Sequence, residues 1–244
     1  MGTTTNVERP RNWKEAKDSG WQPPVYDSEE VKRQVQKGFL TKVYGILAIQ
    51  LAVTTAFCVL FSTVESIQYA VVGNLWITLG LIFVLIPLVI GLVFLKNSYP
   101  WNMWLLAGFT VTMSVVVGTM CATYAMHGHA DVLIMAAAST LFIFVSLTIF
   151  VHVSEIDFSV LGLILPICLL IFIPFMFVCI IFGFHWMWLV GAIGALLFSL
   201  FIVWDSYMIM NRMGCDDYPI ACIELYLDIM NLFSFIMLLG GGGE

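Results

Sequence analysis

Charge is what this sequence has least of. Only 11% of its 244 residues are charged and 61% are hydrophobic, whereas a typical soluble chain is about 25% charged and about 45–50% apolar. The mean hydropathy is +0.97, and so few polar side chains cannot cover the surface of a domain in water. The composition therefore argues against a soluble enzyme, a disordered protein or a small secreted disulfide scaffold, and it predicts a protein whose solvent is the lipid bilayer.

The few charges are unevenly placed. Of the 26 charged residues, 13 lie in residues 1–38. This predicts a hydrophilic, disordered head over 1–38 and a membrane domain over 39–244. The head lacks the apolar core and small-residue cleavage site of a signal peptide, so the first membrane helix is expected to act as an uncleaved anchor. A net charge of −6 is not the footprint of a nucleic-acid-binding protein, and no nucleic-acid partner is expected.

Seven apolar runs predict an all-α membrane protein built as a seven-helix bundle. A membrane helix needs about 20 apolar residues, because each adds about 1.5 Å across a hydrocarbon core about 30 Å thick. The last run carries Glu224 and Asp228, so it either spans the membrane or re-enters it. The runs cover residues 39–63, 70–95, 102–126, 131–153, 160–182, 185–210 and 219–240.

The opposite loops of such a bundle differ in basic residues. All ten Lys and Arg lie in the head or at Lys42, Lys96 and Arg212, which fall on one side of a seven-span chain. Basic residues mark the cytosolic side of a membrane protein. The head is therefore expected in the cytosol and the C-terminus on the other side.

Two buried acids are the candidate functional residues. An ionisable side chain in mid-membrane costs about 2.5–3.5 kcal/mol, so Asp205 and Asp228 each require a reason to be there. Helical periodicity places Asp205 beside a stripe of small residues that permits close helix packing, and it places Asp228 on one face with Glu224 and Asn231. Both acids are expected to point into the bundle and to meet. The stripe consists of Gly191, Gly194, Ala195 and Ser199.

Two carboxyl groups in such a site form a proton-sensitive pair, because both cannot ionise cheaply at low dielectric. When ionised they attract Ca²⁺ only weakly and transiently, since tight calcium sites use about six to eight oxygens, and weak binding suits passage of an ion. The alternative is that Asp205 and Asp228 only hydrogen-bond neighbouring helices. Glu224 either joins the pair or marks the membrane surface. Asp216 and Asp217 form a solvated turn or concentrate cations at a cytosolic mouth.

Other chemistries lack their motifs. An intramembrane aspartyl protease requires Gly-x-Gly-Asp around the second acid, but Asp228 follows Leu225-Tyr226-Leu227. The sequence has no Gly-x-Ser-x-Gly turn and no lysine in the last run, and its six cysteines include no Cys-x-x-Cys pair. No enzyme activity and no cofactor are expected, with Ca²⁺ as a permeant ion. The four histidines also lack the spacing of a metal site: His127, His129, His152 and His185.

The head contains one short recognition motif. Pro23, Pro24 and Tyr26 fit Pro-Pro-x-Tyr, an extended segment that WW domains bind in aromatic grooves. Ubiquitin ligases with WW domains are the expected partners, although so short a pattern also arises by chance.

Five segments, in order and spacing, resemble the Bax inhibitor family, specifically the lifeguard branch of the transmembrane Bax inhibitor motif proteins. The resemblance covers nearly all of residues 30–240. The segments are GFLTKVYGILAIQLAVT (38–54), PWNMWLLAGFTVTMSVVVG (100–118), VSEIDF (153–158), FSLFIVWDS (198–206) and LYLDIMNLFSF (225–235).

The resemblance implies seven helices around a central last helix, and a pH-sensitive calcium leak in an internal membrane, the endoplasmic reticulum or Golgi, that dampens cell death. It assigns the family's paired aspartate sensor to Asp205 and Asp228. Bacterial members hold an arginine near this pair, but residues 69–95 contain no basic residue. Trp204 and Ser206 also depart from the usual Tyr-Asp-Thr. The rival interpretation is a non-conducting scaffold that binds apoptosis regulators or ubiquitin ligases.

Overall fold

The computed structural model describes residues 28–182 and 187–241, and these ranges fold into helices joined by short connections. The chain divides into two units, residues 1–38 and 39–244, and the arrangement below is that of the second unit. In chain order the elements are α2 Ser28–Thr63, α3 Glu65–Val72, α4 Leu75–Leu95, α5 Trp101–Met126, α6 Ala130–Val153, α7 Leu161–Ile181, α8 Met187–Asn211, the 3₁₀ helix η1 Cys215–Asp217, and α9 Tyr218–Gly241.

Six of these helices, α2 and α5 to α9, are long and apolar enough to cross a membrane. The protein is therefore a multi-pass α-helical membrane protein. The helix predicted from residue 39 begins upstream, at Ser28. Residues 28–37 contain no glycine or proline, so nothing in that stretch ends the helix. Part of the head predicted to be disordered is thus helical.

The second predicted run, residues 70–95, is not one helix. It divides into α3 and α4 at Gly73 and Asn74, where the Gly73 amide donates to the Tyr69 carbonyl at 3.1 Å. α4 itself has 21 residues but is not one of the six spans counted above. A count of seven spans therefore stays a prediction that depends on α4.

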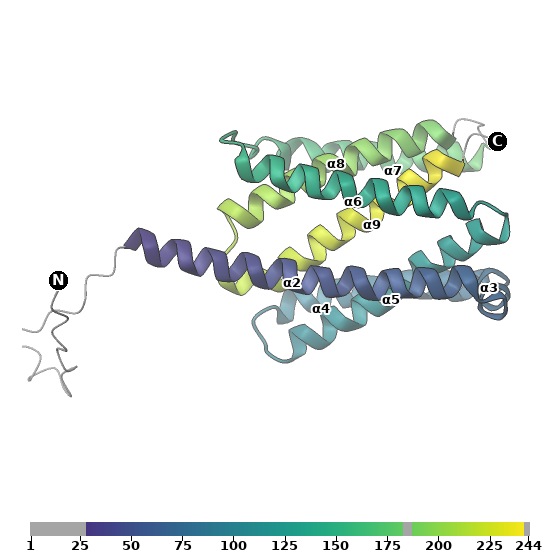
Figure 1. Ribbon diagram of the computed structural model, residues 1–244, viewed down its shortest axis with the longest axis horizontal. Helices are drawn as coiled ribbons and strands as arrows, with labels where there is room; N and C mark the ends of the chain where they lie inside the picture. The colour runs from purple at the N-terminus through teal and green to yellow at the C-terminus, as the bar shows by residue number, and fades with distance from the viewer. Residues whose placement is uncertain (1–27, 183–186, 242–244) are drawn as a thin grey trace, which may run out of the picture. The chain divides into compact units, whose positions relative to one another are not determined.

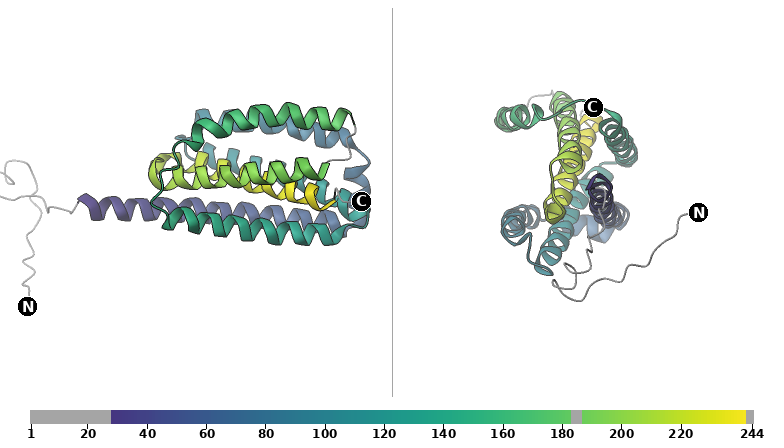
Figure 2. Two further views of the ribbon diagram at one scale, coloured as in Figure 1. Left: turned by 90° about the horizontal axis from the view of Figure 1, so that it is seen from above. Right: turned by 90° about the vertical axis from the view of Figure 1, so that its left-hand side faces the viewer.

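The last helix lies at the centre of the bundle. α9 contacts α4, α5, α6 and α8, and Leu225, Tyr226, Leu232 and Met237 are fully buried. Figure 1 shows α9 passing behind the gap between α2 and α6. The end-on view in Figure 2 shows α2 and α6 on one side of the α8–α9 pair, with α4 and α7 on the other.

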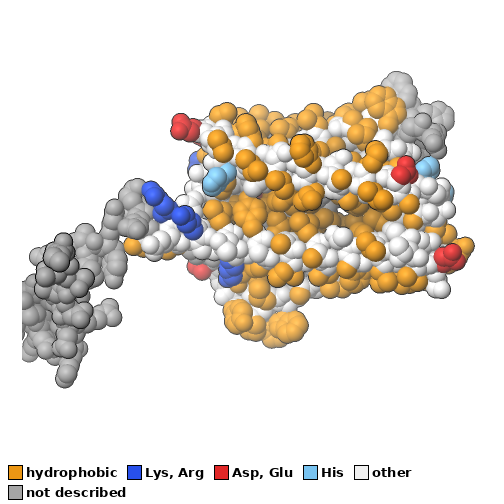
Figure 3. Space-filling model, in the orientation of Figure 1, with side chains coloured by type: hydrophobic (Ala, Val, Ile, Leu, Met, Phe, Trp, Pro, Cys, Tyr) orange, Lys and Arg blue, Asp and Glu red, His pale blue; other side chains and the backbone are white. Residues whose placement is uncertain are grey.

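The outer surface of the bundle is apolar. On α7, Leu163, Leu170 and Ile181 are each more than 70% exposed, and hydrophobic side chains cover the flank seen in Figure 3. A helix that is apolar all round requires either a protein core or lipid on every side. The buried core surrounds α9, so the outward faces of α4 and α7 are those that contact acyl chains.

Basic residues of this unit gather where η1 joins α9. The Lys42 ammonium lies 3.1 Å from the centre of the Tyr218 ring, and the Lys96 ammonium lies 2.7 Å from Asp217 Oδ1. Arg212 directly follows α8. We call this the η1 end. At the opposite end, on the right of Figure 3, the visible face carries acidic and histidine side chains and no lysine or arginine.

Candidate functional site

Asp205 on α8 and Asp228 on α9 meet inside the bundle. Their exposed fractions are 7% and 6%, and their carboxyl groups lie within hydrogen-bonding reach of each other. An ionised carboxylate can only accept hydrogen bonds, so a bond between two carboxyl groups requires that one of them holds a proton. Oδ2 of Asp228 is buried with no partner among the described residues. The site is thus a buried pair of carboxyl groups, close enough to share a proton, with one oxygen unpaired among the described residues.

Two glycines allow the helices that carry this pair to approach closely. A Cβ atom at Gly191 would lie 2.6 Å from the Leu239 backbone nitrogen, and one at Gly194 would overlap the Phe235 ring. The absence of side chains at these two positions therefore permits the α8–α9 contact. The other two residues of the predicted stripe, Ala195 and Ser199, are half-buried. Ala195 packs against the core, and Ser199 donates to the Ala195 carbonyl within α8 at 2.8 Å.

Glu224 lies one helical turn before Asp228 on α9. It is half-buried, and it lies within electrostatic reach of both Asp205 and Asp228. The groups that act on the charge of Asp228 are thus both acidic. No group of three or more His, Cys, Asp or Glu in the described ranges is placed to hold a metal ion.

The two acids of η1 are engaged differently. Asp217 accepts from Lys96 at 2.7 Å and from the Gly214 amide at 3.1 Å. The Lys96 ammonium, followed by that amide, holds the pKa of Asp217 below its ordinary value. Asp216 is exposed. Asp217 therefore closes the turn between α8 and α9 through the Gly214 amide and joins that turn to the end of α4 through the ion pair with Lys96. Asp216 faces outward.

A polar ladder between α2, α5 and α9 was missed by the sequence analysis. Thr54 Oγ1 lies 2.7 Å from Tyr226 Oη and 2.9 Å from Ser114 Oγ, and Gln50 donates to Thr110 at 2.9 Å. All five side chains are buried. The spacing of Gln50 and Thr54, repeated in Thr110 and Ser114, places each pair on one helical face. That repeat was a signal from which the ladder could have been predicted.

Trp204, which departs from the family pattern, packs at the α7–α8 contact. A Cβ atom at Gly162 would overlap its indole ring, and the indole stacks on Tyr207 with ring centres 6.4 Å apart. The Tyr207 hydroxyl donates to Asp157 at 2.6 Å. Trp204 therefore fills space left by a glycine. The predicted WW-binding residues Pro23, Pro24 and Tyr26 lie outside the described residues.

The chain is similar to proteins of one family. Residues 36–243 match the family described as "Inhibitor of apoptosis-promoting Bax1". The chain is 33% identical over 212 residues to the Golgi anti-apoptotic protein of Vaccinia virus (strain Lister), a match that covers 83% of this chain and 84% of that protein. It is 31% identical over 204 residues to protein lifeguard 4 of Mus musculus, a match that covers 83% of this chain and 84% of that protein. It is 29% identical over 240 residues to Bax inhibitor 1 of Schizosaccharomyces pombe, a match that covers 95% of this chain and 89% of that protein.

Proposed function

The chain belongs to the Bax inhibitor family, as its sequence segments predicted, and from this premise we propose that it is an anti-apoptotic membrane protein that leaks Ca²⁺ under the control of Asp205 and Asp228. The observation that carries the proposal is the buried carboxyl pair at the α8–α9 interface. Such a pair is costly inside a membrane and marks a functional site there.

The proposed location is an internal membrane, the Golgi or the endoplasmic reticulum, with seven spans and the N-terminus in the cytosol. The name of the viral relative supports the Golgi. With 21 residues, α4 rises about 31 Å, which is enough to cross a hydrocarbon core of about 30 Å. The basic residues at the η1 end favour that end as the cytosolic one.

In the proposed mechanism the pair holds the closed state. While one proton is shared, the hydrogen bond between Asp205 and Asp228 joins α8 to α9. When both carboxyl groups ionise, that bond is lost and the like charges repel. The helices then move about their contact at Gly191 and Gly194, and the two carboxylates offer a passing Ca²⁺ a weak oxygen site.

The test is Ca²⁺ flux through the full chain reconstituted in lipid vesicles over a range of pH. We expect Asp205→Asn and Asp228→Asn each to change the flux and to remove its response to pH. Asp131→Asn, an exposed acid in the first turn of α6, is the control and should behave like wild type. Wild-type flux with a wild-type pH response in both pair variants would refute the sensor.

The alternative function is a non-conducting scaffold for apoptosis regulators or WW-domain ubiquitin ligases, which the motif Pro23-Pro24-Val25-Tyr26 favours. A scaffold should retain its protection against cell death in the Asp205→Asn/Asp228→Asn double variant and lose it when residues 1–38 are deleted. A leak channel should lose its protection in the double variant and retain it when residues 1–38 are deleted. One cell-survival assay with both variants separates the two functions.

A further inference from the structure

A deep apolar groove runs between α2 and α6. On its floor, the α9 side chains Ile229, Met230 and Phe233 are only 3%, 6% and 8% exposed. On its rims, Val59 of α2 and Ile134 of α6 are 57% and 73% exposed. The cavity measures about 770 Å³, and Figure 3 shows a recessed, hydrophobic strip between the two helices. A cavity with a buried floor and exposed rims opens sideways, toward lipid.

The hydroxyl groups along this groove are already engaged or buried. Thr55, Ser62 and Thr63 each donate to the α2 carbonyl four residues earlier, at 2.6–2.8 Å. Thr54 belongs to the polar ladder described above, and the hydroxyl oxygen of Thr140 is buried. A serine or threonine bonded to its own helix is satisfied without a ligand. The groove therefore suits a hydrocarbon chain rather than water or an ion.

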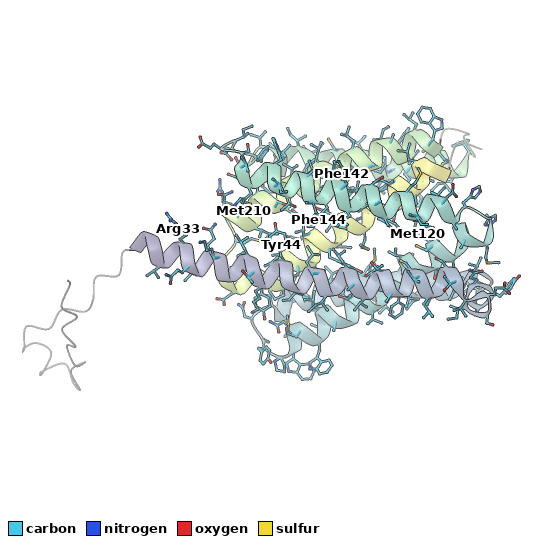
Figure 4. The ribbon with its side chains drawn as sticks, viewed as in Figure 1. Arg33, Tyr44, Met120, Phe142, Phe144 and Met210 are labelled. Atoms are coloured by element: carbon cyan, nitrogen blue, oxygen red, sulfur yellow. The ribbon has the colours of Figure 1, made fainter. Side chains whose placement is uncertain are left out.

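The groove is about as deep as one leaflet of a bilayer. Its lining on α2 runs from Thr63, the last residue of that helix, to Leu51, which is about 18 Å at about 1.5 Å per residue. On α6 it runs from Ala130, the first residue, to Phe144, or about 21 Å. Figure 4 shows Phe144 in the gap between these helices. Since half of the hydrocarbon core is about 15 Å, the groove extends from the membrane surface away from the η1 end to about the midplane.

Two small residues of α6 leave room in the groove. Ala137 and Ala138 line the cavity between the larger side chains of Ile134 and Leu141, and both alanines are exposed rather than packed in the core. A larger side chain at either position would therefore extend into the groove without displacing a buried neighbour.

The mouth of the groove lacks basic residues. Glu65, which follows Thr63 by two residues, is exposed, and Figure 3 shows acidic and histidine side chains at this end. The chain has no lysine or arginine between Lys42 and Lys96 or between Lys96 and Arg212, so none lies on α3, α5 or α6. An anionic headgroup would find no cation on these helices, whereas an ammonium group is attracted to the acidic side chains. Charge complementarity thus favours a choline or ethanolamine headgroup.

We propose that this groove binds one acyl chain of a phospholipid with a cationic ammonium headgroup, taken from the leaflet away from the η1 end. The chain lies between α2 and α6 against the α9 floor, and its terminal carbons reach Met230, in the middle of α9. A cavity of about 770 Å³ is within the range of ligand sites, about 300–1,000 Å³. Close packing of the chain against the groove supplies the attraction, since both are apolar and the bilayer is too. The site does not depend on the Ca²⁺ leak proposed above, because it uses neither Asp205 nor Asp228.

The experiment places the full chain in phosphatidylcholine vesicles that contain a small fraction of phosphatidylcholine with a diazirine at the end of one acyl chain. After irradiation, mass spectrometry locates the labelled residues. We expect label at Met230, which is buried in the groove floor, and none at Met237, which is buried on the same helix outside the groove. Leu170 on α7, 74% exposed, reports ordinary contact with the surrounding lipid.

Filling the groove should displace the chain. We expect Ala137→Phe/Ala138→Phe to lower Met230 labelling about fivefold or more, because the added rings overpack the occupied groove, and to leave Leu170 labelling unchanged. Ala56→Phe is the matched control, since Ala56 is an exposed residue of α2 outside the groove, and it should change neither.

The proposal is overturned if Met230 is labelled no more than Met237 in the wild type, a comparison that decides it even where the double variant fails to fold. Labelling of Met230 that is the same in the folded double variant as in the wild type would also overturn it.

The headgroup is tested by exchanging it. Phosphatidylglycerol with the same diazirine chain, at the same small fraction, should label Met230 about two- to fivefold less, as expected for one or two exposed charge interactions. Glu65→Gln should narrow that difference. Equal labelling of wild-type Met230 by the two lipids would overturn the assignment of a cationic headgroup.

Discussion

Among individual residues, Asp157 has the most strongly altered acidity outside the spans. It lies between α6 and α7, and its Oδ1 accepts from the Tyr207 hydroxyl at 2.6 Å and from the Ser159 amide at 2.9 Å. These bonds, that from Tyr207 above all, lower the pKa of Asp157 from 3.8 to about 2. Asp157 therefore stays ionised throughout the physiological range, and a pH response of the protein must arise elsewhere.

The sign of this shift predicts how stability depends on pH. A lowered folded-state pKa stabilises the fold above the unfolded value of 3.8, and the stabilisation is lost as the pH falls toward about 2. We expect Asp157→Ala to lower the melting temperature in detergent by an amount that is constant between about pH 5 and about pH 8 and that narrows below about pH 4. Scanning calorimetry at several pH values measures this.

Glu155→Ala, an exposed acid in the same connection, is the control and should change the melting temperature little at any of these pH values. The lowered pKa would be contradicted if the difference in melting temperature between wild type and Asp157→Ala changed between about pH 5 and about pH 8.

Among the elements, the α8–α9 pair is held by backbone proximity. A methyl group at Gly191 would meet the α9 backbone at Leu239 and Phe235, at distances of 2.6 to 2.9 Å. Backbone cannot rotate away, so we expect Gly191→Ala to destabilise the protein by about 1–3 kcal/mol. Unfolding in mixed micelles by increasing denaturing detergent measures the change.

Gly45→Ala is the matched control, because no atom lies within 4 Å of a Cβ atom at that position of α2. There the replacement should be neutral or should stabilise the helix by about 0.5–1 kcal/mol. Equal effects at Gly191 and Gly45 would mean that α8 and α9 do not pack as closely as described.

The polar ladder joins α2 to α9 through a tyrosine. Tyr226 is fully buried and its hydroxyl lies 2.7 Å from Thr54 Oγ1. Hydrogen bonds between membrane helices contribute about 0.6 kcal/mol on average, so we expect Tyr226→Phe to lower the free energy of unfolding by about that amount. Tyr69→Phe, at a side chain that is 68% exposed, should leave it unchanged.

A double-mutant cycle with Thr54→Val tests the pair directly. Tyr226→Phe should lower the free energy of unfolding by less once Thr54 has been replaced, because the hydrogen bond between the two side chains is already absent. Additive losses would show that Tyr226 stabilises the bundle through packing rather than through this bond.

For the whole molecule, the number of spans determines the side on which each terminus lies. Seven spans place the N-terminus in the cytosol and the C-terminus on the opposite side of the membrane, whereas six would place both on the same side. We expect an epitope tag at the N-terminus to be digested by protease added to sealed microsomes, and a C-terminal tag to be protected. Digestion of both tags would show that α4 does not cross the membrane.

Sequence alone determined the solvent of this protein and the residues that the solvent makes costly. Apolar length and buried charge are local properties, so they identified the long helices and singled out Asp205 and Asp228 without any coordinates. The division of residues 70–95 into α3 and α4 was not predicted, since the apolar character continues across it.

Only the tertiary structure decided which side chains meet. The contacts between Tyr207 and Asp157 and between Tyr226 and Thr54 join residues 50 and 172 positions apart. The apolar groove likewise takes its rims from α2 and α6 and its floor from α9. Periodicity orients a residue on its own helix, but which helix it faces depends on the packing of the whole bundle. For that reason the sequence identified the acids, and the structure identified the polar groups around them.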